Sequence, residues 1–137
     1  MKLVIGGYAQ GKLDYVLEKI SGGDMCARSK VVQEIGKNEQ EVINTEEIVI
    51  VNHLHSWIRT RISEGGCPEE EIMLFLDKNP DCILISDEVG NGIVPLDAFE
   101  REYRERTGRI LIELAKKAEE VERVICGIGH RIKERSF

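Results

Sequence analysis

A glycine-rich turn near the start of the chain has the residue types and spacing of a phosphate-binding loop. It consists of Gly6, Gly7, Tyr8, Ala9, Gln10, Gly11, Lys12 and Leu13. The pattern is G-x-x-x-x-G-K-[S/T], except that Leu13 stands where the hydroxyl residue is expected. In such a loop the backbone N–H groups surround phosphate oxygens, the lysine reaches the outer phosphates, and the hydroxyl ligates magnesium. The alternative is a plain strand-to-helix turn in which glycine supplies a positive φ.

Two further groups of polar residues follow apolar runs. Asp87 and Glu88 come directly after Cys82–Ser86, and Asn52 and His55 come after Ile48–Val51. Glu88 is the candidate magnesium ligand or general base, with Asp87 as the second candidate metal ligand. A carboxylate that caps a helix or bonds turn amides is the rival interpretation of Glu88. Asn52 and His55 are candidate nucleotide contacts.

The elements that must position these residues alternate along the chain. Lys2–Ile5, Ile48–Val51, Cys82–Ser86 and Val121–Cys126 are short apolar runs that predict buried strands. Helical spacing is expected over the following segments: 13–20, 52–62, 68–78 and 96–118. Val31 and Val32 suggest a further short strand, residues 38–43 a helical turn, and the C-terminal tail an edge strand.

Strands that alternate with helices predict an α/β fold, with a mostly parallel sheet and helices on both faces. Ligands of such sheets bind outside the carboxyl ends of the strands. The turns after the first strand, after Ile48–Val51 and after Cys82–Ser86 all fall at this edge. We therefore expect Lys12, the two acids and the His55 imidazole to line one crevice.

Length, charge and composition limit the classes of function that this protein can have. A chain of 137 residues is expected to form a single domain spanning 1–137. A net charge of −6, with no basic stripe to offset it, argues against nucleic-acid binding. No apolar run approaches the roughly 20 residues that span a bilayer, and no secretory signal is visible, so a cytoplasmic protein is expected. Cys82 and Cys126 lie in apolar runs and are expected to be buried thiols.

The stretch from Ser86 to Pro95, S-D-E-V-G-N-G-I-V-P, resembles the (S/T)-N-E-V-G-x-G-I-V-P signature of the adenosylcobinamide kinase/adenosylcobinamide-phosphate guanylyltransferase family. The resemblance extends to the turn at Asn52 and the helix around Gly108. It also includes the ending from Val124 to Lys133, and the first turn resembles the family's G-G-x-x-S-G-K-S. The similarity covers nearly the whole chain.

This resemblance implies a P-loop NTPase-like sheet and phosphoryl transfer from ATP or GTP, with Mg²⁺, to the hydroxyl of adenosylcobinamide in cobalamin biosynthesis. Lys12 and Glu88 would then be the catalytic residues, with residues 6–13 holding the nucleotide. The implied partners are a nucleoside triphosphate and a corrinoid. The family also implies a multimer, and the sequence leaves the oligomeric state open.

The chain departs from the family pattern around the same crevice. Leu13 replaces the magnesium-ligating hydroxyl, Gln10 replaces a serine, and Asn52 replaces an acid. The segment that carries the family's guanylylated histidine is nearly absent, so guanylyl transfer through that residue is not expected. The alternative function is therefore a non-catalytic paralogue that acts as a nucleotide- or corrinoid-binding or protein-interaction module.

Overall fold

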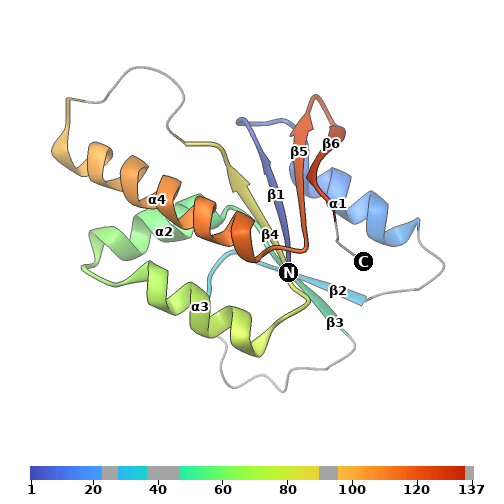
Figure 1. Cartoon of the computed structure of the whole chain (residues 1–137), viewed down its shortest axis with the longest axis horizontal. Coiled ribbons are helices and arrows are strands. Elements are labelled where there is room, and N and C mark those ends of the chain that lie inside the picture. Colours follow the sequence, from blue (N-terminus) through green and yellow to red (C-terminus); the bar gives the residue numbers. More distant parts are fainter. Residues whose placement is uncertain (23–27, 37–46, 90–95, 135–137) are drawn as a thin grey trace.

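The apolar runs form one six-stranded sheet in the computed structural model, which describes residues 1–22, 28–36, 47–89 and 96–134 (Figure 1). Its strands are β1 (Lys2–Gly6), β2 (Arg28–Val32), β3 (Glu47–Val51), β4 (Ile83–Asp87), β5 (Glu120–Ile125) and β6 (Ile128–Lys133). Their spatial order is β2-β3-β4-β1-β5-β6. Every neighbouring pair is parallel except β5 and β6, which form an antiparallel hairpin. The expected strand near Val31 is therefore present, and β6 is the edge strand.

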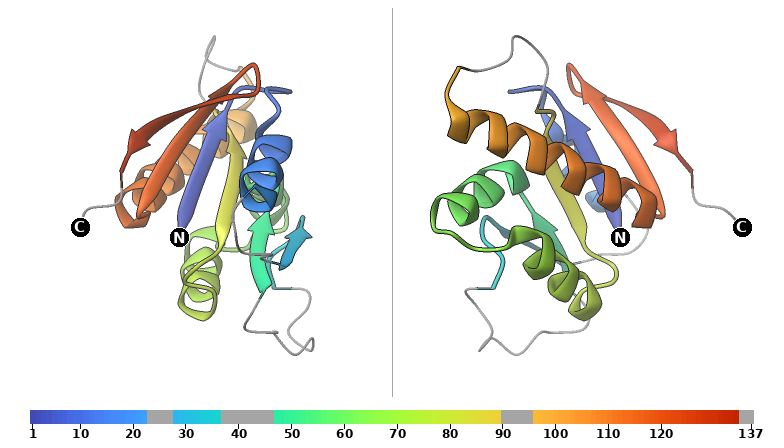
Figure 2. Two further views of the ribbon diagram at one scale, coloured as in Figure 1. Left: turned by 90° about the vertical axis from the view of Figure 1, so that its right-hand side faces the viewer. Right: turned by 60° about the vertical axis from the view of Figure 1, so that its left-hand side comes forward.

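Helices cover both faces of this sheet (Figure 2). They are α1 (Lys12–Ser21), α2 (Leu54–Ser63), α3 (Pro68–Lys78) and α4 (Ala98–Lys117). Helix α1 packs on one face, and α2, α3 and α4 pack on the other. The predicted α/β architecture with a mostly parallel sheet is confirmed. Among the helices of the described residues, none combines the length and the hydropathy that a membrane span requires.

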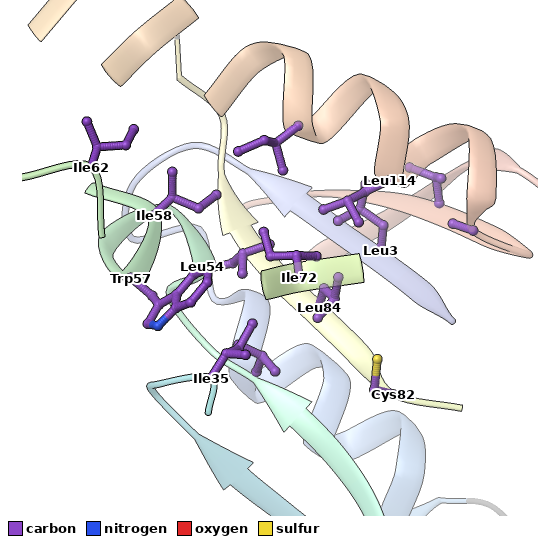
Figure 3. Packing of buried hydrophobic residues seen from close by; sticks show 14 of the residues in the cluster. Leu3, Ile35, Leu54, Trp57, Ile58, Ile62, Ile72, Cys82, Leu84 and Leu114 are labelled. Carbon is purple, nitrogen blue, oxygen red and sulfur yellow. The ribbon is translucent and has the colours of Figure 1, made fainter. Parts of the chain in front are cut away.

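The larger core lies between the sheet and the three helices α2, α3 and α4 (Figure 3). Its fully buried side chains come from both layers: Leu3, Leu54, Ile58, Ile72, Leu84 and Leu114. Burying an aliphatic side chain of this size stabilises a fold by roughly 1.5–3 kcal/mol. The core therefore fixes the helices against the central strands β1 and β4, whose carboxyl ends carry the candidate site.

Two expectations differ from the structure in detail, and a third is not tested by it. Helix α2 begins at Leu54 instead of Asn52, because His53 has left-handed backbone angles (φ 55°, ψ 46°). Cys126 is an exposed turn residue and not a buried strand thiol, whereas Cys82 is buried. Cys126 and Gly127 have φ values of 50° and 74°, and positive φ at both central residues is what a two-residue hairpin loop of type I′ requires. The helical turn expected over 38–43 lies outside the described residues.

Gly108 marks no break, since α4 runs continuously from Ala98 to Lys117. A Cβ added at Gly108 would have no heavy atom within 4 Å in the described part of the chain. The glycine therefore makes no close packing contact there.

A buried carboxylate fastens α1 to the sheet. Glu122 of β5 is 1% exposed, and its Oε1 accepts hydrogen bonds from Lys2 Nζ (3.0 Å) and Lys19 Nζ (2.6 Å). Arg131 Nε of β6 lies 3.8 Å from the same oxygen. Burial raises the pKa of Glu122, but hydrogen bonds from Lys19, Tyr15 and Lys2 outweigh it and lower the pKa to about 2. One acid thus links β1, α1 and the β5–β6 hairpin.

We expect Glu122→Gln to reduce the free energy of unfolding at neutral pH by on the order of 3 kcal/mol. The folded-state pKa lies below the ordinary value of 4.5. The stabilisation is therefore complete above that value and is lost as the pH falls toward about 2. Urea unfolding near pH 7 and near pH 3 measures both effects.

The control is Glu18→Gln, on the exposed side of α1, which should change stability by no more than about 0.5 kcal/mol. An unfolding free energy that responds equally to both substitutions would contradict this role of Glu122.

Candidate functional site

The glycine-rich turn joins β1 to α1 in a shape that two of its glycines allow. A Cβ on Gly6 would lie 2.6 Å from the backbone oxygen of Val124 on the neighbouring strand β5. Gly11 is the N-cap of α1 with φ 79°, and no side chain caps the helix at this residue. The first N–H groups of a helix lack intrahelical partners and attract anions. The turn thus presents the start of α1 at the carboxyl end of the sheet.

Gln10 attaches this turn to the β5–β6 hairpin. Its side-chain Oε1 accepts a hydrogen bond from the Cys126 N–H (2.8 Å), and its backbone oxygen accepts one from the Gly127 N–H (2.9 Å). Both amides of the hairpin turn are therefore satisfied by one residue. The sequence predicted Gln10 as part of the nucleotide-binding turn, at a place where the family has serine. It did not predict the contact with the hairpin, because nothing local signals a contact so distant along the chain.

Lys12, the first residue of α1, points its ammonium into the space between the turn and β4. The residue is 7% exposed. Its Nζ lies 2.7 Å from Asp87 Oδ1 and donates to the backbone oxygen of Gly7, also at 2.7 Å. The strand register explains the meeting, because Gly6 pairs with Asp87 across the parallel β1–β4 ladder. The Glu88 N–H then donates to Gly6 O at 2.8 Å.

His55 contacts Asp87 from the side of α2. Its Nδ1 accepts a hydrogen bond from the Asp87 N–H (3.0 Å), and its Nε2 lies 3.4 Å from Asp87 Oδ2. Burial lowers the pKa of His55, and the neighbouring His53 and Lys12 lower it further against the opposing effect of Asp87. The ring is therefore neutral at neutral pH. With Nδ1 as acceptor, its proton resides on Nε2 and faces the carboxylate.

Glu88 is held by a residue that the sequence analysis did not single out. Arg123 of β5 places Nε 2.6 Å from Glu88 Oε1 and Nη2 3.0 Å from Oε2. This two-point geometry fixes the plane of the carboxylate. The sequence places Arg123 inside the expected strand Val121–Cys126 and gives no other signal of this contact.

The other predicted site residues surround this arrangement. Tyr8 is 86% exposed on the turn. Leu13 is half-buried and packs against the smaller core beneath α1. Asn52 is buried, and its N–H donates to Val32 O at 2.9 Å. Residues 90–95 of the resemblance motif lie outside the described residues.

The carboxylate oxygens of this site suit Mg²⁺ only when a bound phosphate supplies further oxygen atoms to the ion. Asp87 and Glu88 supply two adjacent carboxylates, and oxygen is the donor atom that Mg²⁺ prefers. No group of three or more metal-binding side chains occurs in the described ranges. Magnesium sites commonly combine one or two carboxylates with substrate phosphates and water, and the residues at this edge fit that pattern.

The structure thus brings together Lys12, His55 and Asp87, which come from the three turns expected to meet. Glu88 lies beside them on the same strand end. The functional roles of these residues stay predictions.

Comparison with known proteins adds a family relationship. The family model described as "Cobinamide kinase / cobinamide phosphate guanyltransferase" matches residues 25–132. The bifunctional adenosylcobalamin biosynthesis protein CobU of Salmonella typhimurium (strain LT2) is 38% identical over 69 residues, which cover 47% of this chain and 38% of that protein. CobU of Escherichia coli (strain K12) is 45% identical over 51 residues, covering 37% of this chain and 28% of that protein. The chain therefore matches less than half the length of each relative.

The glycine contacts generate a prediction about the turn. Gly6→Ala should lower the free energy of unfolding by about 1–3 kcal/mol, because the added Cβ meets a backbone oxygen that cannot move without shifting β5. Gly7→Ala is the matched control, since among the described residues its Cβ would contact only the Gln10 side chain, at 3.6 Å. Thermal or urea unfolding of both variants makes the comparison. Equal losses of stability would contradict the packing role of Gly6.

Proposed function

The chain belongs to the cobinamide kinase / cobinamide phosphate guanyltransferase family, and we propose that it transfers a phosphoryl group from ATP or GTP to the hydroxyl of adenosylcobinamide in cobalamin biosynthesis. The observation that carries the proposal is the position of Lys12. Its ammonium stands at the start of α1, between the glycine-rich turn and the carboxylate of Asp87. The family match itself begins after this turn, so the geometry of residues 6–12 supports the proposal independently.

Each residue of the site has an assigned role. The backbone amides of residues 6–11 and the start of α1 hold the phosphates, and Lys12 stabilises the charge that develops on the transferred group. Asp87 is the residue that would hold Mg²⁺, and Glu88 is assigned to proton transfer. When bound, that ion would neutralise phosphate charge and orient the phosphate oxygens.

The reaction is a displacement at phosphorus. The oxygen of the acceptor hydroxyl forms a bond to the γ-phosphorus, while the bond from that phosphorus to the β,γ-bridging oxygen breaks. Nucleoside diphosphate leaves, and the hydroxyl proton passes to a carboxylate, for which we assign Glu88. Arg123 fixes the orientation of the Glu88 carboxylate by two contacts. We propose phosphoryl transfer and not guanylyl transfer, which in the family passes through a histidine. Both ring nitrogens of His55 face Asp87 and are not directed toward a nucleotide.

The kinase reaction is tested with purified protein, adenosylcobinamide and γ-labelled ATP or GTP in the presence of Mg²⁺. We expect labelled adenosylcobinamide phosphate, and we expect Lys12→Ala to reduce its formation by at least about 100-fold. Lys116→Ala, an exposed lysine at the end of α4, is the matched control and should retain the rate. Folded wild-type protein that forms no product with either nucleotide would contradict the kinase proposal.

A second candidate is a non-catalytic nucleotide- or corrinoid-binding module. The specific observation in its favour is that Leu13 offers no hydroxyl at the end of the turn and instead packs into the core beneath α1. Asn52 is likewise uncharged and buried. The crevice therefore lacks two oxygen ligands, a hydroxyl at position 13 and a carboxylate at position 52, that the family pattern would supply.

The double variant Leu13→Ser, Asn52→Asp discriminates between the two candidates. If the site retains kinase geometry, restoring a hydroxyl and a carboxylate should increase Mg²⁺-dependent nucleotide affinity by about tenfold, at a cost of roughly 1–3 kcal/mol in stability. Titration calorimetry with ATP and GTP measures the affinity, and the single variants serve as controls. Unchanged affinity and turnover in a folded double variant would favour the binding module.

A further inference from the structure

The ammonium of Lys12 is already neutralised by the protein itself. It contacts Asp87 Oδ1 and Gly7 O, each at 2.7 Å. The side chains of Lys12 and Asp87 are only 6% and 17% exposed. A lysine ammonium has three N–H donors, so these contacts leave one for a phosphate oxygen. The charge that would attract a phosphate is balanced by a carboxylate at the same place.

Asp87 is also held from its other side. Its second oxygen faces His55 Nε2 at 3.4 Å, and its backbone N–H donates to Nδ1 of the same ring. Because Nδ1 accepts that hydrogen bond, the ring holds its single proton on Nε2, and it orients Asp87 without cancelling its negative charge. An anion that approaches Lys12 therefore meets a fixed carboxylate, in a half-buried setting where solvent screens like charges poorly.

We propose that Asp87 makes this site selective for nucleoside triphosphates that carry a divalent cation, and that it excludes metal-free phosphates. This inference rests on the proposed nucleotide-binding function. A triphosphate that chelates a cation brings a positive charge that a carboxylate can ligate. Asp87 then releases Lys12 and binds the cation instead. Lys12 thereby becomes available to the phosphate oxygens. A metal-free triphosphate offers Asp87 no such partner.

The role is specific to the position of Asp87. Asp14, in the first turn of α1, is exposed to solvent, where its charge is screened. Removing either carboxylate changes the net charge of the protein equally. A difference between the two variants therefore measures the Lys12–Asp87 contact and not general repulsion of anions.

Titration calorimetry of the whole chain with ATP and with GTP, in Mg²⁺ and in EDTA, tests the proposal. We expect the wild type to bind the metal-free nucleotide at least about tenfold more weakly than the Mg²⁺ complex. Asp87→Asn keeps the shape of the side chain and an oxygen that accepts from Lys12. It should strengthen metal-free binding by about tenfold without strengthening binding of the Mg²⁺ complex. Asp14→Asn should preserve the wild-type difference.

Circular dichroism and thermal melting establish that the variants are folded, and Asp87→Ser replaces Asp87→Asn if the latter does not fold. Equal wild-type affinity in Mg²⁺ and in EDTA would overturn the selectivity while leaving nucleotide binding intact. The same result for Asp14→Asn and Asp87→Asn would overturn the role of Asp87. No binding of either nucleotide to any folded variant would instead contradict the proposed function, and the inference with it.

Discussion

The parallel pairing of β1 with β4 is the constraint on which the candidate site depends. The two strands lie side by side in the middle of the sheet, although residues 7–82, more than half of the chain, separate them in sequence. The chain leaves β1 into α1 on one face, and after β4 it leads to α4 on the opposite face. Loops that depart to opposite faces leave a crevice between the strand ends. The Gly6–Asp87 register places Lys12 and the acids at that crevice.

Each carboxylate at the crevice is balanced by a positively charged side chain in direct contact with it. Lys12 pairs with Asp87, and Arg123 pairs with Glu88. Each acid is held by a cation from a different element, so the two carboxylates lie next to each other without leaving a large uncompensated charge. Gln10 and Glu122 then tie the turn and α1 to the β5–β6 hairpin. The hairpin braces the end of the sheet where the proposed phosphates would bind.

Periodicity and turn residues predicted much of the fold, because the relevant interactions are local. The β-branched runs, Pro68 at the first turn of α3 and the glycine-rich turn each act within a few residues. The meeting of Lys12, Asp87 and His55 was also predictable, since parallel strands place their following turns at one edge. The contacts of Arg123 with Glu88 and of Gln10 with the hairpin were not, because they depend on tertiary distances. Cys126 was misassigned because an apolar run does not reveal a tight turn at its last residue.

The central claim is that residues 6–12 hold phosphates and that Lys12 changes partner when they bind. A crystal structure of the protein with a non-hydrolysable GTP analogue and Mg²⁺ tests it most directly. We expect phosphate density enclosed by the turn, with Lys12 Nζ bonded to a phosphate oxygen and separated from Asp87. Phosphates located elsewhere, with the Lys12–Asp87 contact intact at 2.7 Å, would contradict it.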